Sequence, residues 1–201
     1  MSVRDFSPVS PTFSMPSLLA RLVGILALFA SAACFAQGTA GPYVPTPWPI
    51  VDELLKLGSI KKTDYLIDIG SGDGRLVIEA AKRYGASGLG IDIQAPLVEL
   101  ATANAAKEGV SDRVEFVVDD IFQTGLLSRA TIVTVYLLPS IMGKLVPKLL
   151  KDLKPGTRIV SHDYALEGMK YDKVLTFDFQ EKLDISGTTR TVLYLYTVPG
   201  K

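Results

Sequence analysis

The chain has 201 residues, of which 48% are hydrophobic and 21% charged, so it can bury the core of one ordinary domain. Its 21 basic and 21 acidic side chains cancel and no basic cluster stands out, which argues against a nucleic-acid surface. One cysteine, Cys34, and one histidine, His162, exclude a Cys/His metal site and an intramolecular disulfide.

Residues 1–36 are typical of an export signal. Arg21 precedes fifteen apolar or small residues, 22–36, whereas a membrane-spanning helix needs about 20. We expect cleavage after Ala36 and an exported domain, periplasmic or secreted. An uncleaved membrane anchor is the alternative, and a lipoprotein signal with Cys34 lipidated fits less well. Contact with a membrane is expected only through this N-terminal segment.

A proline-rich segment, residues 37–49, contains the string GPYVPTPWP and must run extended. Strands and helices alternate in the domain that follows, residues 50–201. Short apolar runs predict strands at 65–69, 88–93, 113–118, 131–138 and 157–162. Helical spacing predicts helices at 50–57, 74–85, 95–108 and 140–154, the last interrupted at Pro147.

The end of the chain changes character. Residues 173–184 and 188–198 read as two strands joined by a turn, which predicts an antiparallel hairpin. The predicted fold class is therefore α/β, a doubly wound, mostly parallel seven-stranded sheet with a C-terminal antiparallel hairpin.

The string DIGSGDGR, residues 68–75, lies between the first strand and the next helix, where this architecture binds ligands. Its glycines allow a ligand to approach the main chain, and the amides of a helix N-terminus follow. The spacing is G-x-G-x-G rather than the dinucleotide pattern G-x-G-x-x-G. Asp68 and Asp73 would repel a pyrophosphate and attract a cationic end such as an ammonium.

The ends of the second and third strands carry carboxylates that could bind the rest of such a ligand. Asp92 can accept hydrogen bonds from ribose hydroxyls. Asp119 or Asp120 can accept one from an adenine amino group, beside the apolar Ile121. An amino-acid-like end, a ribose and an adenine together describe S-adenosylmethionine. The candidate cofactor contacts are Asp68, Gly70, Ser71, Gly72, Asp73, Gly74, Asp92, Ile93, Asp119, Asp120 and Ile121.

The strings YLIDIGSGDGR, GIDI and VVDDIF resemble the successive cofactor motifs of class I S-adenosylmethionine-dependent methyltransferases, over roughly residues 42–198. The resemblance implies a seven-stranded, Rossmann-like methyltransferase fold with S-adenosyl-L-methionine as cofactor. A nicotinamide-dependent oxidoreductase is disfavoured by the glycine spacing.

Further strings, PYVPTP, TVYLLP, PKLLKDLKPGTRIVSH and VLYLYTV, are similar to archaeal broad-specificity protein-lysine methyltransferases and, more distantly, to the mitochondrial ATP synthase c-subunit lysine methyltransferases. The resemblance implies a protein substrate with an accessible lysine and a proline-rich segment that folds over the cofactor. Tyr43 and Thr46 would then close the site, with Thr46 at the methionine end. A plain linker is the alternative for this segment, and a small-molecule methyltransferase or a non-catalytic S-adenosylmethionine-binding protein are the alternatives for the function.

Tyr136 and His162 are the candidate catalytic residues, at the ends of the fourth and fifth strands. Residues 136–139 read YLLP and lack the Asn/Asp-Pro-Pro-aromatic string of many families that methylate adenine or glutamine. Tyr136 is either a wall of the acceptor channel or a core aromatic. Because positioning does most of the work in methyl transfer, His162 is favoured as a structural or substrate-shaping residue over a general base.

Overall fold

The computed structural model describes residues 43–183 and 187–200. The predicted signal or anchor at residues 1–36, and residues 37–42 of the proline-rich segment, lie outside the described residues. Within the described part of the chain, no helix combines the length and apolar character that crossing a membrane requires.

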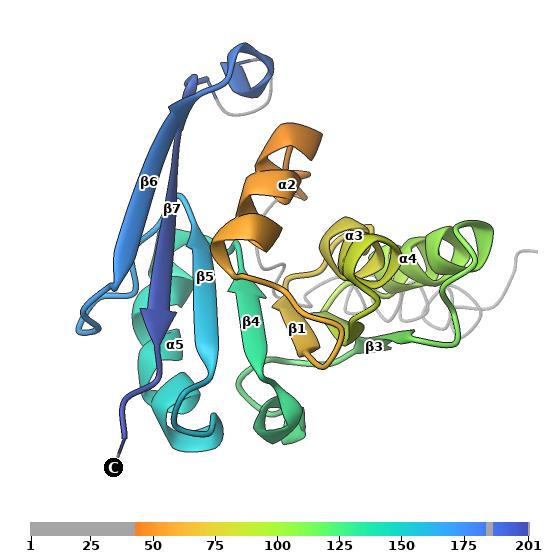
Figure 1. The fold of residues 1–201 in the computed structure, drawn as a ribbon, viewed down its shortest axis with the longest axis horizontal. Helices are drawn as coiled ribbons and strands as arrows, with labels where there is room; N and C mark the ends of the chain where they lie inside the picture. The colour runs from red at the N-terminus through yellow and green to blue at the C-terminus, as the bar shows by residue number, and fades with distance from the viewer. Residues whose placement is uncertain (1–42, 184–186, 201) are drawn as a thin grey trace, which may run out of the picture. The chain divides into compact units, whose positions relative to one another are not determined.

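A seven-stranded sheet organises the described residues (Figure 1), in the order β3-β2-β1-β4-β5-β7-β6. Five mutually parallel strands are Tyr65–Ile69 (β1), Ser87–Asp92 (β2), Val114–Val118 (β3), Ile132–Val135 (β4) and Arg158–His162 (β5). The antiparallel hairpin is Lys173–Asp178 (β6) and Arg190–Thr197 (β7), with β7 also antiparallel to β5. The helices are Trp48–Leu57 (α2), Arg75–Tyr84 (α3), Ala95–Lys107 (α4) and Pro139–Asp152 (α5), with short 3-10 turns at Leu126–Arg129 (η2) and Gln180–Lys182 (η3). The predicted fold class is confirmed.

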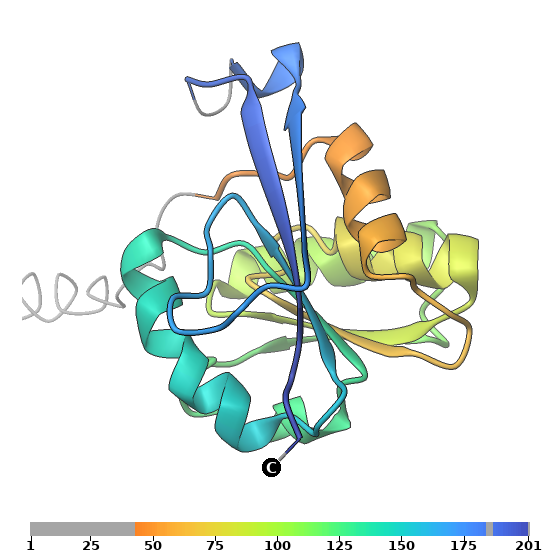
Figure 2. The same ribbon diagram turned by 60° about the vertical axis from the view of Figure 1, so that its left-hand side comes forward.

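The sheet separates two apolar cores, because successive strand side chains point to opposite faces. Leu66 of β1 belongs to the core under α2 and α3, whereas its neighbour Ile67 belongs to the core under α5. Figures 1 and 2 show α2, α3 and α4 on one face of the sheet and α5 on the other. The central strand β4 reads IVTV and is buried at every position, as parallel strands of a doubly wound sheet are, whereas β5 (RIVSH) is apolar at Ile159 and Val160 and polar at its two ends.

Several predictions of where elements end or break are wrong. Strand β6 ends at Asp178 rather than residue 184, because the 3-10 turn η3 follows it. Helix α2 begins at Trp48 rather than residue 50, because Pro49 fits the first turn of a helix. Strand β4 ends at Val135 rather than residue 138, before Pro139 opens α5. Pro147 does not interrupt α5, which is one continuous helix. An internal proline costs about 3 kcal/mol, and the buried face of α5, including Leu145 and Leu149, offsets that cost.

The carboxyl ends of β1, β2, β4 and β5 meet at one edge of the sheet because these strands are parallel. The chain order reverses between β1 and β4, which are hydrogen-bonded neighbours. Such a switch point is where doubly wound sheets bind their ligands. The predicted loop 68–75 leaves β1 at this point.

Candidate functional site

The loop after β1 is shaped by glycines with positive φ. Gly72 has φ +53°, and a Cβ there would collide with the ring of Tyr43. Gly74 has φ +81°, and a Cβ there would lie 2.6 Å from the Cζ of Phe116. Side chains are therefore excluded both by backbone conformation and by space. The contact also places Tyr43, from the proline-rich segment, directly over the loop.

Asp68, the next-to-last residue of β1, carries a buried carboxyl group. The hydroxyl of Thr134, its neighbour in β4, donates to its Oδ1 at 2.6 Å. The pKa of Asp68 is raised to about 7, chiefly by burial and also by the charges of Asp92 and Asp73, although the hydrogen bond from Thr134 lowers it. A cationic ligand would favour the ionised form, which agrees with the role predicted for this residue.

Asp92 ends β2 and holds the loop in shape. Its Oδ2 accepts the amide N–H of Gly72 at 2.9 Å, and its Oδ1 accepts that of Gln94 at 2.9 Å. A carboxylate has about four acceptor positions, so two remain for the ribose hydroxyls that it is predicted to bind. Ile93 follows it, half-buried.

Asp73, predicted to attract the cationic end of a ligand, forms an ion pair with Arg75 instead. Its two carboxylate oxygens accept hydrogen bonds from Nε and Nη2 of Arg75, at 2.9 and 2.6 Å. The pKa of Asp73 lies below its usual value because the hydrogen bonds and charge of Arg75 outweigh the effect of burial. The negative charge predicted to attract a ligand's ammonium is therefore already balanced by Arg75. Among the described residues, Asp68 is left as the loop acid without a basic partner at hydrogen-bond distance.

The segment after β3 brings the remaining predicted cofactor residues to the same edge. The amide of Asp119 donates to the carbonyl of Asp92 at 3.1 Å, which ties the two strand ends together. Asp120 caps the following turn by accepting the amide N–H of Phe122 at 2.9 Å. Ile121 is buried and Phe122 is 37% exposed, so this turn offers an apolar surface beside two carboxylates.

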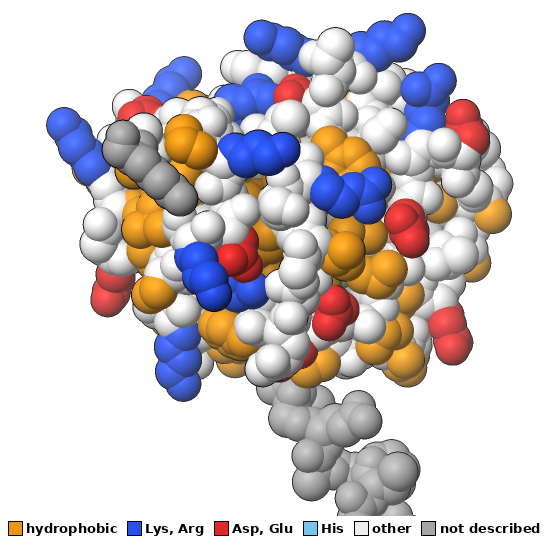
Figure 3. Space-filling view, turned by 90° about the horizontal axis from the view of Figure 1, so that it is seen from below, with side chains coloured by type: hydrophobic (Ala, Val, Ile, Leu, Met, Phe, Trp, Pro, Cys, Tyr) orange, Lys and Arg blue, Asp and Glu red, His pale blue; other side chains and the backbone are white. Residues whose placement is uncertain are grey.

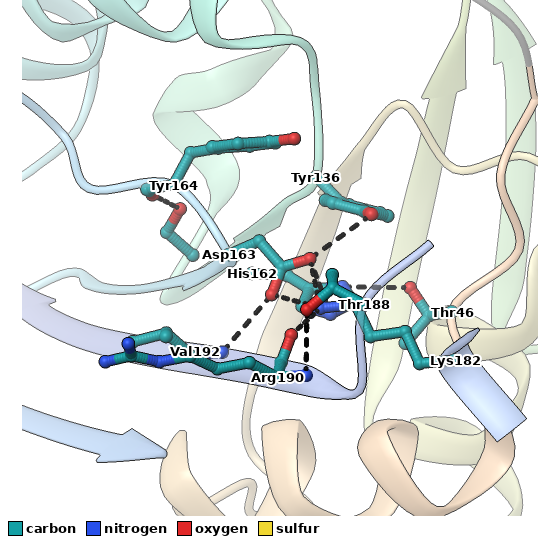
Figure 4. Close-up of polar contacts among 10 residues, drawn as sticks. Thr46, Tyr136, His162, Asp163, Tyr164, Lys182, Thr188, Arg190 and Val192 are labelled. Atoms are coloured by element: carbon teal, nitrogen blue, oxygen red, sulfur yellow. Dashed lines mark hydrogen bonds and ion pairs between the residues drawn. The ribbon is translucent and has the colours of Figure 1, made fainter. Parts of the chain in front are cut away.

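Tyr136 and His162 lie together (Figure 4), with ring centroids 4.0 Å apart. His162 is buried, and burial lowers its pKa to about 4. Its Nδ1 lies 3.4 Å from the hydroxyl of Thr46, and its Nε2 lies 3.6 Å from the carboxylate of Asp163. That carboxylate favours the tautomer with hydrogen on Nε2, in which Nδ1 accepts a hydrogen bond from Thr46.

Two charged residues complete this cluster: Asp163, which the sequence places beside His162 at the end of the fifth strand but to which it assigns no role, and Lys182, which it does not mark. Asp163 follows β5 with φ +62° and accepts the hydroxyl of Tyr136 at 3.3 Å. The buried Lys182, from η3 between β6 and β7, donates to both oxygens of Asp163, at 2.6 and 2.7 Å, and to the carbonyl of Arg190 at 2.5 Å (Figure 4). No sequence pattern marks a lysine as buried, whereas Asp163 is recognisable from its position after the fifth strand.

Eleven of the thirteen predicted cofactor residues thus lie at the carboxyl edge of the sheet. The other two, Tyr43 and Thr46, lie in the proline-rich segment that covers the loop. Within the described ranges, no cluster of His, Cys, Asp and Glu side chains has the arrangement of a metal site. Arg75, Thr134, Asp163 and Lys182 are the additions from the structure.

Comparisons with known proteins agree with this architecture. A family model described as the ANTKMT methyltransferase domain matches residues 68–173. A protein-lysine N-methyltransferase of Saccharolobus islandicus is 36% identical over 158 residues, which cover 78% of this chain and 93% of that protein. The ATP synthase c-subunit lysine N-methyltransferase of Xenopus laevis is 33% identical, with 68% of this chain and 61% of that protein covered.

A solved structure is also similar. The crystal structure of an RNA methyltransferase from Salinibacter ruber, in complex with S-adenosyl-L-homocysteine, superposes with a TM-score of 0.70. Its sequence is 46% identical, and the alignment covers 79% of this chain and 95% of that one.

Proposed function

We propose, from the premise that this chain belongs to the ANTKMT methyltransferase domain family, that it methylates the side-chain amine of protein lysines. The chain is an S-adenosylmethionine-dependent methyltransferase. The observation that carries the lysine assignment is the 36% identity to a protein-lysine N-methyltransferase along 93% of that protein's length.

The residues at the carboxyl edge fit this cofactor. The hydroxyl of Ser71 is buried in the loop and has no hydrogen-bond partner among the described residues, so a polar ligand would satisfy it. Asp92 keeps acceptor positions for ribose hydroxyls, and Ile121 with Phe122 gives apolar surface for a base. When bound, S-adenosylmethionine supplies a methyl group on a positively charged sulfur. Asp68 would hold its ammonium group.

The surroundings of Tyr136 suit an amine acceptor. The rings of Tyr136 and Tyr164 stack at 6.3 Å between centroids, and aromatic faces attract ammonium groups. Desolvation beside such a wall lowers the pKa of an entering lysine from about 10.4 and favours the neutral amine that methyl transfer requires. His162 is a weak base, since its pKa is about 4, so proton removal by His162 contributes little at neutral pH.

RNA methylation is the second candidate function, because the Salinibacter ruber neighbour at 46% identity is described as an RNA methyltransferase. One observation favours lysine over RNA. The formal net charge is zero, whereas phosphate binding needs a cluster of Lys and Arg. Figure 3 shows the opposite edge of the sheet from the candidate site, where basic and acidic side chains are interspersed with hydrophobic ones.

One labelling experiment separates these functions. The protein is incubated with methyl-labelled S-adenosylmethionine and a cell extract, and the label is then measured in protein, RNA and low-mass fractions. Label released as methylated lysine after acid hydrolysis supports the proposal. Label that ribonuclease removes would establish RNA methylation instead, and label in the low-mass fraction would indicate a small-molecule acceptor. Asp92→Ala is the control, because it weakens cofactor binding; no label with either protein would favour a non-catalytic binding protein.

For the location, we propose that residues 1–36 direct export, with a retained membrane anchor as the alternative. The proposal is supported by the short apolar run after Arg21. An exported enzyme would need a supply of cofactor outside the cytoplasm. A reporter fused after residue 60 and assayed in both compartments tests it, and reporter activity confined to the cytoplasm would contradict export. Cleavage is tested separately, by the mass of the purified chain.

A further inference from the structure

Arg75, the last residue of the loop string, reaches out of the loop to the proline-rich segment. We call residues 43–47 of that segment the strap. Nε and Nη2 of the Arg75 guanidinium donate to the carboxylate of Asp73, and Nη1 donates to the main-chain carbonyl of Thr46 at 2.6 Å. One planar group therefore joins the loop to the strap.

The ring of Trp48 packs against the face of the same guanidinium. The Cζ of Arg75 lies 4.9 Å from the centroid of the Trp48 ring, at the first residue of α2. A guanidinium can hydrogen-bond in its plane and stack on an aromatic face at once, which an ammonium cannot do. Arg75 thus fixes the point where the strap passes into α2.

The strap also contacts His162, next to Tyr136. Thr46 is 6% exposed, and its hydroxyl contacts Nδ1 of His162 (Figure 4). At the other end of the strap, the ring of Tyr43 covers Gly72. The strap therefore bridges the cofactor loop and the cluster around His162. Thr46 makes both contacts: its main-chain carbonyl accepts a hydrogen bond from Arg75, and its hydroxyl lies at hydrogen-bond distance from Nδ1 of His162.

We propose that Arg75 is a positioning residue that fastens the strap over the cofactor loop and thereby slows the release of cofactor and product. The strap covers Gly72, a residue of the loop that holds the ligand. Ligand release is slower while that cover is held in place, and Arg75 donates the hydrogen bond that joins the loop to the main chain of the strap. Asp73 then serves to orient Arg75 rather than to bind the ligand.

The test is Arg75→Lys in the full chain. Lysine keeps a positive charge beside Asp73 but cannot form the planar fork or the stack. Arg83→Lys is the matched control, because Arg83 lies on the same helix and makes an exposed ion pair with Asp52. The dissociation rate of S-adenosylhomocysteine is measured by displacing labelled ligand with unlabelled ligand. Trp48, the single tryptophan of the chain, reports on the strap by its fluorescence.

We expect Arg75→Lys to release S-adenosylhomocysteine on the order of tenfold faster, the effect of losing one charge-assisted hydrogen bond. The fluorescence of Trp48 should change in the same variant, and Arg83→Lys should match the wild type in both measurements. Release at the wild-type rate would overturn the proposal, even with a lowered melting temperature, because Arg75 would then be only structural. Equal acceleration in both variants would overturn it too. The ligand is the cofactor product alone, so the outcome does not depend on the methyl acceptor.

Discussion

The protonation of Asp68 should control the affinity for the cofactor. With a pKa of about 7 in the free protein, Asp68 is ionised in about 9% of molecules at pH 6 and about 76% at pH 7.5. A ligand whose ammonium requires the carboxylate binds with an affinity proportional to that fraction. The affinity for S-adenosylhomocysteine should therefore rise about eightfold between these pH values.

The affinity rises with pH because the pKa of Asp68 is shifted upward. The pKa of Asp68 is raised, so the carboxylate is lost as the pH falls through about 7, and binding weakens on the acid side. His162, with a pKa of about 4, stays neutral across this range and does not contribute. Calorimetric titrations at several pH values measure the effect. Asp68→Asn should bind weakly and without this slope; an equal slope in wild type and Asp68→Asn would refute the reasoning.

Three further variants test the site. Asp92→Ala should weaken S-adenosylhomocysteine binding by about 1–3 kcal/mol in calorimetry, and an equal loss in the exposed Asp112→Ala would remove the ribose assignment. Gly72→Ala should lower affinity at least tenfold, because both φ and the Tyr43 ring oppose a side chain; Gly109→Ala, with φ +70° but open space, should lose only stability. His162→Gln should reduce kcat without changing the shape of the pH–rate profile between pH 6 and 8, and the loss of an acid limb near 6.5 would show that His162 is the base after all.

The sheet could be predicted from sequence because its signals are local. Strand β1 matches its apolar run at 65–69, and α3 ends at Tyr84, before Gly85, whose φ of +69° terminates the helix. The prediction of a break at Pro147 is wrong because burial of the helix face, which is not a local feature, decides the continuity of α5. Helix ends and turns with proline or glycine are local features, whereas the cost of an internal proline is balanced by packing elsewhere.

Candidate site residues at strand ends could be predicted from the sequence, whereas contacts between segments far apart in the sequence could not. Asp68 and Asp92 follow apolar runs, so the parallel topology brings them together. The pairing of Asp73 with Arg75 is close in sequence, yet the reach of Arg75 to Thr46 depends on how the strap returns over the loop. Lys182 meets Asp163 through the hairpin, nineteen residues further along the chain, and only the folded chain shows that this lysine is buried.

Strand β7 is the last to leave the ribosome, yet it lies inside the sheet, between β5 and β6. Until its residues are available, β5 lacks one neighbour and β6 has no partner strand at all. Synthesis from the N-terminus can complete the pairs among β1 to β5 first, but the contact of Lys182 with Asp163 and the pairing of β7 with β5 must wait for the hairpin. A nascent chain would therefore form the loop at 68–75 before the hairpin completes the surroundings of His162 and Asp163.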